Sequence, residues 1–182
     1  MLHLPCVELN MEERFALFSL VKTVVCDGVD KGCFVCPEPP KDKVLTLFVA
    51  NFVTLYVKNE LRGCIGSINP SIPLWHSVCK NAYSSAFQDY RFEGFTEKDL
   101  VDLTFDISLL SEFASIENNG ENKLLSELEK NRDGLLIKYE DAQSLFLPSV
   151  WKHFDSRRDF LNALKRKAGL PADFWHESIQ VS

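Results

Sequence analysis

Apolar side chains recur at helical spacing near the start of the chain. The large ones lie three or four positions apart and are Phe15, Phe18, Val21 and Val25. Asn10 is followed three residues later by Glu13, which is the pattern of a capping box at the start of a helix. Asp27 and Gly28 then interrupt the apolar run. We therefore expect an amphipathic helix that begins after Asn10 and ends near Gly28.

A strand-forming pattern follows a connection rich in proline and charge over residues 33–43, which we expect to be exposed. Residues 44–50 and 52–57 are dense in β-branched and aromatic side chains, and residues 58–60 make a plausible tight turn into a strand over 61–68. This order predicts a β-hairpin whose second strand contains the letters LRGCIG. Pro73 suits the first turn of the next helix, over residues 73–87, whose small side chains permit close packing.

The second half of the chain has its own helices and strands. Residues 103–109 alternate apolar and polar side chains and predict a half-buried strand, preceded by a helix start at Thr96 and Asp99. A short helix over 123–130, strands over 135–139 and 144–148, and a helix capped by Asp155 or Ser156 and running to residue 168 complete the pattern. Helices separated by hairpin-like strand pairs predict an α+β fold with mainly antiparallel sheets.

The composition and charge of the chain indicate a globular protein and exclude several classes of partner. The 182 residues, 46% of them hydrophobic and 25% charged, suit one globular domain or two small lobes sharing a core. The net charge of -6 lies along the chain without a basic stripe, so no nucleic acid partner is expected. No signal-like start and no membrane-length apolar run are found, so we expect a cytoplasmic protein with no membrane contact. Six cysteines in a reducing compartment are expected to be free thiols.

Cys64 is the candidate nucleophile. In a regular strand the side chains of Arg62 and Cys64 project from one face, and those of Leu61 and Ile65 project from the other. A neighbouring guanidinium lowers the pKa of a cysteine and raises its thiolate fraction, and the thiolate is the form that attacks. The glycines on either side allow a ligand or the backbone to approach closely.

A structural role explains the same residues. Free cysteines are among the most often buried residues, and glycines within a strand commonly mark a bulge or a tight crossing. A catalytic cysteine also needs a base, and His76 is the nearest histidine in the sequence. The other histidines cannot be placed against Cys64 from the sequence; they are His3, His153 and His176.

Two further groups of polar residues are candidates for a site. Asp89 and Arg91 lie between aromatic residues, where they can pair with each other, cap the preceding helix, or reach towards Arg62 and Cys64. Cys33 and Cys36 have half the spacing of a zinc site, but a structural zinc needs four ligands and the rest of the pattern is incomplete. We expect neither a metal nor a cofactor.

Several segments together resemble a known family. They are FVTLYVKNELRGCIGSINP, NAYSSAFQDYRF, DISLLS, DGLLI, FLPSVW and KRKAGLP. Their order and the hexapeptide LRGCIG are similar to the AMMECR domain, in the stand-alone prokaryotic form labelled AmmeMemoRadiSam system protein A. The resemblance implies one AMMECR-like domain over residues 1–182, an α+β protein of two lobes sharing a cleft, with a lobe boundary near 110–120.

The resemblance also implies a site and partners. The hexapeptide would line the cleft with Leu61, Arg62, Gly63, Cys64, Ile65 and Gly66, and beside it would lie Asp89, Arg91 and Phe92. The implied partners are a Memo-like protein and a radical-SAM protein. The chain departs from the family pattern at several points. Among them, Tyr90 stands where a proline is usual, Asp133 stands where a histidine is frequent, and residues 49–51 lack the glycine that is common before the FVTL run.

Two hypotheses follow. In the first, the chain is a module that binds a small-molecule ligand or a partner protein through the hexapeptide and acts with the Memo-like and radical-SAM proteins. In the second, the chain is an enzyme in which Cys64 attacks a substrate, Arg62 or Arg91 holds an anionic group, and Asp89 positions one of them. The absence of an obvious base in the sequence favours the first hypothesis.

Overall fold

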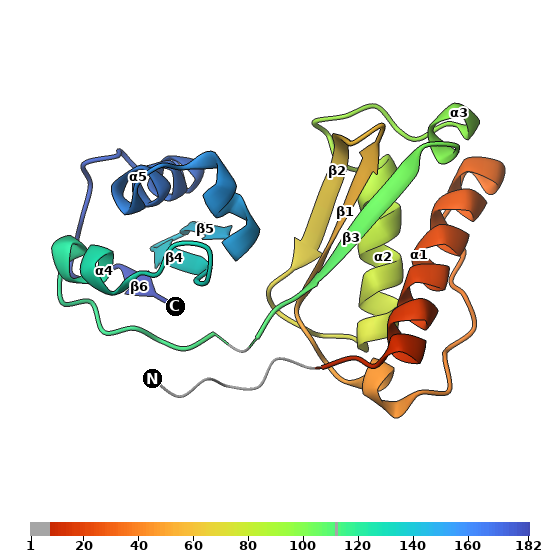
Figure 1. Cartoon of the computed structure of the whole chain (residues 1–182), viewed down its shortest axis with the longest axis horizontal. Helices are drawn as coiled ribbons and strands as arrows, with labels where there is room; N and C mark the ends of the chain where they lie inside the picture. The colour runs from red at the N-terminus through yellow and green to blue at the C-terminus, as the bar shows by residue number, and fades with distance from the viewer. Residues whose placement is uncertain (1–7, 112) are drawn as a thin grey trace. The chain divides into compact units, whose positions relative to one another are not determined.

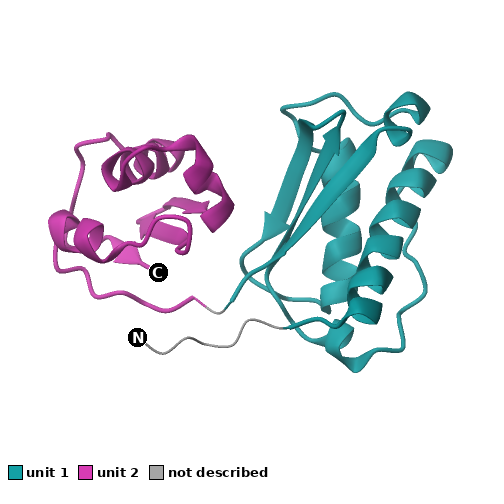
Figure 2. Ribbon diagram, in the orientation of Figure 1, with its two compact units in different colours: residues 1–112 teal, residues 113–182 magenta. Residues whose placement is uncertain are grey.

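The computed structural model describes residues 8–111 and 113–182. It divides into two compact units, Met1–Glu112 and Phe113–Ser182 (Figure 2). His3, and Cys6 among the six cysteines, lie outside the described residues. In the part of the chain that the structure describes, no helix has the length and apolar character needed to span a membrane.

The first unit is a three-stranded sheet with two long helices on one face (Figure 1). Its elements are α1 (Met11–Lys31), the 3-10 helix η1 (Lys43–Thr46), β1 (Asn51–Val57), β2 (Glu60–Ser67), α2 (Leu74–Phe87), α3 (Glu97–Leu100) and β3 (Leu103–Leu109). The strand order is β2-β1-β3, and both pairs are antiparallel. The core between sheet and helices contains Val53 and Leu55 of β1 with Leu17 and Val21 of α1 and Val78 of α2. The α+β prediction is confirmed.

Helix α1 begins as predicted but ends later. Asn10 and Glu13 form the capping box, with Asn10 Oδ1 accepting from the Glu13 N–H at 3.0 Å. The prediction that the helix ends near Gly28 is wrong, because Gly32, with a φ of 68°, is the residue that ends it. Gly28 has a packing role instead: a Cβ atom there would lie 2.3 Å from Cε2 of Phe87 in α2.

The strand expected over residues 44–50 does not form. Residues Lys43–Thr46 make a 3-10 turn that places Leu45 in the core with no exposed surface. The segment then binds the start of α2, since the Leu74 N–H donates to the Leu47 carbonyl at 2.8 Å. The side chains of this stretch favour a strand, but the burial of Leu45 in the core favours the 3-10 turn. Tertiary packing therefore decides its conformation.

The predicted hairpin forms from β1 and β2, and Lys58 and Asn59 take positive φ values of 53° and 65° in its turn. The pairing contains an irregularity: Tyr56 pairs with Leu61 and Leu55 pairs with Gly63, so Arg62 has no partner residue on β1. This is a β-bulge, in which two residues of one strand oppose one residue of the other.

The second unit combines a small antiparallel sheet with two helices. Its elements are α4 (Glu121–Glu127), β4 (Leu135–Tyr139), β5 (Ala142–Phe146), the 3-10 helix η2 (Pro148–His153), α5 (Arg157–Lys167) and β6 (Gln180–Val181), with strand order β5-β4-β6. Ser156 caps α5, as one of the two predicted residues. The helix predicted over 123–130 begins and ends earlier than expected, and Pro148 opens η2 rather than ending a strand.

Candidate functional site

The bulge at Arg62 changes the faces of β2. Val53, Leu55 and Val57 face the helices, so the side chains of Thr54 and Tyr56 point to the other face of the sheet. Their partners on β2 are Cys64 and Leu61, which therefore share this other face. We call it the open face, and it carries Thr54, Tyr56, Leu61, Cys64 and Asp106. Among residues 8–111, no helix packs against it (Figure 1).

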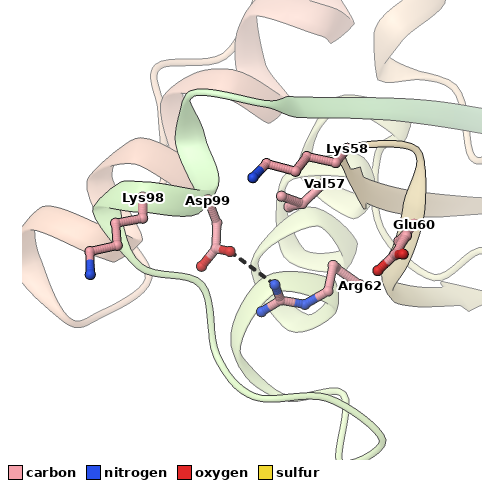
Figure 3. A pocket seen from close by; sticks show the side chains of 6 residues that line it. All are labelled: Val57, Lys58, Glu60, Arg62, Lys98 and Asp99. Carbon is pink, nitrogen blue, oxygen red and sulfur yellow. Dashed lines mark hydrogen bonds and ion pairs between the residues drawn. The ribbon is translucent and has the colours of Figure 1, made fainter.

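Arg62 and Cys64 consequently lie on opposite faces, and the prediction that they share one is wrong. Arg62 is the extra residue of the bulge and points to the side of the helices, with its guanidinium 5.4 Å from the centre of the buried Phe95 ring. Its Nη1 donates to Asp99 Oδ1 at 2.9 Å (Figure 3). The prediction that Leu61 and Ile65 share a face is wrong for the same reason.

A pocket lies beside Arg62. It has a volume of about 340 Å³ and is lined by Val57, Lys58, Glu60, Arg62, Lys98 and Asp99 (Figure 3). Burial opposes ionisation of Asp99, but hydrogen bonds from Thr96 and Arg62 outweigh it and lower the pKa of the Asp99 carboxyl. Arg62 therefore links the hairpin to α3 through a half-buried ion pair at the edge of this pocket.

The backbone of Cys64 is held from the outer edge of β2 by an ion pair. The Cys64 N–H donates to Asp89 Oδ2 at 2.9 Å, and Arg91 Nη2 donates to the Cys64 carbonyl at 3.2 Å. Asp89 and Arg91 also bind each other, with 2.6 Å between Oδ2 and Nη2. Of the three roles considered for this pair, the structure shows mutual pairing and contact with the Cys64 main chain.

Asp89 is buried, with 4% of its surface exposed. Hydrogen bonds from the Arg91 side chain lower the pKa of its carboxyl to about 2 from the ordinary 3.8, against the opposing effect of burial, and the N–H groups of Cys64 and Arg91 add to the lowering. Asp89 is therefore ionised at neutral pH and suits a positioning role rather than a proton-transfer role.

Ser85 of α2 fixes the next residue of β2. Its hydroxyl accepts from the Ile65 N–H and donates to the Val53 carbonyl, both at 2.8 Å, and Ile65 and Val53 are partners across the hairpin. Gly63 permits this close approach, because a Cβ atom there would lie 1.9 Å from the Ser85 carbonyl oxygen. The glycine thus has the structural role of a tight crossing.

The Cys64 side chain is half-buried on the open face, and Thr54 Oγ1 donates to its sulfur at 3.3 Å. Thr54 pairs with Cys64 on one side and Asp106 on the other, so these three side chains form a row across the sheet. Burial raises the pKa of the Tyr56 phenol, and the nearby Asp106 carboxylate raises it further. The open face thus gathers a thiol, a hydroxyl, a phenol and an exposed carboxylate.

The sequence prediction did not include Thr54, Tyr56 or Asp106. The period of two in residues 103–109 marked Asp106 as a residue of the exposed face, and extending the same period to β1 would have marked the other two. The missing information was the register that brings the three strands side by side.

The other predicted site residues are Gly66, Phe92 and Leu61, and the first two make packing contacts. Gly66 faces the Phe52 ring, which a Cβ atom at position 66 would approach to 2.3 Å. Phe92 lies under Arg91, with 5.3 Å between the guanidinium carbon and the ring centre. Leu61 is 41% exposed on the open face.

Other reactive groups lie elsewhere. His76, the one histidine among residues 8–111, stacks on Trp75 and Phe34. Burial raises the pKa of Cys79 to about 12, with a smaller contribution from Cys36. Within residues 8–111 and 113–182, no group of three or more histidine, cysteine, aspartate or glutamate side chains is arranged to hold a metal ion.

Comparison with known proteins places this geometry in a family. The family model described as AMMECR1 matches residues 18–182. The chain belongs to the AMMECR1 family. It is 33% identical over 150 residues to Protein Ta0236 of Thermoplasma acidophilum, covering 80% of this chain and 72% of that protein. A protein of Thermofilum pendens is 29% identical over 191 residues, with coverage of 95% and 87%.

A solved structure supports the fold of this AMMECR1-family chain. The crystal structure of the uncharacterised protein PH0010 from Pyrococcus horikoshii is similar, with a TM-score of 0.80 and 31% sequence identity. The match covers 91% of this chain and 84% of that one. The family resemblance predicted from the hexapeptide is thereby confirmed.

Proposed function

We propose that this AMMECR1-family chain is a cytoplasmic binding module whose ligand or partner contacts the open face around Cys64. The observation that carries the proposal is the way Cys64 is held. Asp89 and Arg91 bind its main chain from the strand edge, and Ser85 binds the next residue, so the thiol has a fixed position on a face that α1 and α2 do not cover. A preorganised surface of this kind lowers the entropy cost of binding.

The side chains of the open face are of types that contribute to binding a ligand or a partner protein. Tyr56 supplies a large aromatic surface with few rotatable bonds, and aromatic residues of this type are enriched among the residues that dominate binding energy. Leu61 adds exposed apolar area, and Asp106 adds a carboxylate that can pair with a cationic group. The partners proposed from the family resemblance are the Memo-like and radical-SAM proteins.

Enzymatic use of Cys64 is the alternative, and the geometry gives it less support. In that hypothesis Arg62 holds an anionic group beside the thiol, but Arg62 is paired with Asp99 on the opposite face. Arg91 remains near the Cys64 main chain, where it is already paired with Asp89. A nucleophilic cysteine needs a base in hydrogen-bond reach, and the described partner of the Cys64 sulfur is the Thr54 hydroxyl.

The test is binding between purified proteins. The chain is mixed with the Memo-like protein and, separately, with the radical-SAM protein of the same genome, and affinity is measured by biolayer interferometry. Tyr56→Ala and Leu61→Glu are expected to weaken binding at least about tenfold, as for residues at the centre of an interface. The matched control is Leu47→Glu, which changes a leucine of similar exposure that is not part of the open face.

Cys64→Ser separates the two functions. A binding module is expected to keep its affinity within about threefold after this substitution, since serine retains the size and hydrogen-bonding character of the side chain. Arg91→Glu is a poor probe of the surface because it would also break the contacts with Asp89 and Cys64. If neither protein binds, the two proteins are not partners of this chain. If Leu47→Glu weakens binding as much as Leu61→Glu, the binding surface is not the open face.

A further inference from the structure

The outer edge of β3 has free backbone groups. The hydrogen bonds between β1 and β3 run through alternate residues, beginning with Lys58 N–H to the Asp102 carbonyl and ending with Leu110 N–H to the Ala50 carbonyl. In this register Thr104 and Asp106 bond to β1. The N–H and carbonyl groups of the intervening residues point away from the sheet, and these are Leu103, Phe105, Ile107 and Leu109. Among residues 8–111 and 113–182, none bonds to them.

The opposite edge of the same sheet is occupied. On β2, both outward groups of Cys64 are bound, by Asp89 and by Arg91. Natural sheets commonly protect an open edge with lysine, proline or a bulge, because unpaired strands recruit other strands. β2 has the bulge and the ion pair, whereas β3, with the sequence LTFDISL, contains neither lysine nor proline. β3 is therefore the edge at which a further strand can pair.

Helix α1 presents apolar side chains below this edge. Met11, Phe15 and Phe18 lie four and three residues apart, on one stripe, and are 79%, 72% and 45% exposed. The Phe18 ring meets Phe105 of β3 edge to face, with 5.4 Å between ring centres. Helix α1 lies on the helix side of the sheet (Figure 1), and Phe18 is the residue of the stripe that contacts β3.

The layer formed by α1 and α2 is wider than the three-stranded sheet that it covers. Two packed helices about 8–10 Å apart cover roughly four strands spaced about 4.8 Å apart, but this sheet has three. The consequence appears in burial: Val53 and Leu55 of the central strand are fully buried, whereas Phe105 and Ile107 of β3 remain partly exposed. A fourth strand beside β3 would cover them together with the α1 stripe.

We propose that β3 accepts an extended segment of a partner protein as a fourth strand. Apolar side chains of the segment face Phe15 and Phe18, and a lysine or arginine on its other face lies beside Asp106. Main-chain hydrogen bonds supply affinity in such strand addition, and alternating side chains supply specificity. Charge complementarity favours a basic segment, because Asp106 is exposed next to the free edge and the chain carries a net charge of -6.

A second copy of this chain fits the edge less well. When β3 pairs antiparallel with another β3 in full overlap, the central residue, Asp106, lies opposite itself. Like charges placed directly opposite each other destabilise a strand pair. The two proposals share Asp106, which lies on the open face. The outward backbone groups of β3 and the exposed side chains of α1 belong to strand addition alone, so the N-methylated peptide and Phe15→Ser test it independently of Cys64.

The probe is a fluorescein-labelled octapeptide of alternating valine and lysine, added to the full chain and followed by fluorescence anisotropy. Three controls, each compared with the binding of this peptide to the wild-type chain, distinguish strand addition from nonspecific binding. A valine-glutamate peptide, a valine-lysine peptide N-methylated along one edge, and the Phe15→Ser chain should each show at least about tenfold weaker binding. Asp106→Lys should reverse the preference to the valine-glutamate peptide, and Asp30→Lys, an exposed α1 carboxylate, should retain the wild-type preference.

Amide hydrogen exchange locates the binding. On addition of the valine-lysine peptide, exchange at Phe105 and Ile107 should slow, while Thr104 and Asp106, already bonded to β1, change little. Four results would overturn the proposal: no binding at a millimolar concentration; equal binding of the N-methylated peptide; a dimer of the chain that Phe15→Ser dissociates; or tenfold tighter peptide binding after removal of residues 1–7, which would mean that the chain's own start occupies the edge.

Discussion

The main chain of Cys64 is bound by the carboxylate of Asp89, 25 residues further along the chain, through an N–H to Oδ2 hydrogen bond of 2.9 Å. Arg91 completes the contact by binding both Asp89 and the Cys64 carbonyl. The pair takes the place that a neighbouring strand would occupy at the edge of β2. The position of the thiol therefore depends on an ionised carboxylate, and this dependence can be measured.

Asp89→Asn should destabilise the chain by about 2 kcal/mol at neutral pH, which is the energy equivalent of a pKa lowered from 3.8 to about 2. The stabilisation from a carboxyl with a lowered pKa is present above the unfolded value and disappears as the pH falls through the folded value. The difference between wild type and Asp89→Asn in urea denaturation should thus shrink between about pH 4 and pH 2.

Asp102→Asn is the matched control for this measurement. Asp102 is exposed and lies 4.0 Å from Lys58, so its replacement should change the free energy of unfolding by less than about 0.5 kcal/mol. A pH-independent difference between wild type and Asp89→Asn would show that the aspartate is not held ionised by Arg91.

Gly63→Ala should be strongly destabilising, by about 3 kcal/mol or more, because the new methyl group would lie 1.9 Å from the Ser85 carbonyl oxygen and the backbone of α2 would have to move. Gly94→Ala is the control. A Cβ atom at position 94 finds its nearest neighbour at 3.7 Å, so this variant should unfold within about 0.5 kcal/mol of wild type. Similar melting temperatures for the two variants would contradict the tight crossing of β2 and α2.

The hydrophobic pattern predicted β3 and α2 well because each buries one regular face. Leu103, Phe105 and Ile107 alternate with polar residues in the sequence and face the core in the structure. A local pattern of this kind is set by the element itself. The capping box of Asn10 and Glu13 was equally readable, since its two residues are three apart.

The sequence-based predictions were wrong where the role of a residue is set by a contact with a residue far away in the sequence. Gly28 was interpreted as a helix end, but it is small because Phe87 packs against it. The alternation through Arg62 failed because the bulge depends on the register with β1. The Asp89–Arg91 pair was one of three roles left open by the sequence, and its contact with Cys64 required the folded chain.

A buried ion pair in the second unit gives an asymmetric prediction. Lys165 of α5 is fully buried and donates to Glu121 of α4 at 2.9 Å, whereas the Glu121 side chain is 19% exposed. Glu121→Gln leaves a buried ammonium without its counter-charge and should cost about 3 kcal/mol in chemical denaturation. Lys165→Met fills the same space, and the remaining glutamate can be hydrated, so its cost should be about 1 kcal/mol.

Lys123→Met is the control for the variants Glu121→Gln and Lys165→Met. Lys123 pairs with Glu127 on an exposed part of α4, and such pairs contribute little to stability. Its free energy of unfolding should match wild type within about 0.5 kcal/mol. Equal costs for Glu121→Gln and Lys165→Met would indicate that Lys165 gains hydration that the folded structure does not show.

The rate of iodoacetamide labelling, read for each cysteine peptide by mass spectrometry, tests the state of Cys64 directly. Cys26, Cys33 and Cys36 are exposed and should be labelled first. Cys79 is buried and its pKa is raised to about 12, so it should react only when the chain unfolds. Cys64, half-buried beneath the Thr54 hydroxyl, should react between these limits. Labelling of Cys64 ahead of the exposed thiols at pH 6 would instead indicate a thiolate-rich nucleophile, and the enzyme hypothesis would then replace the binding module.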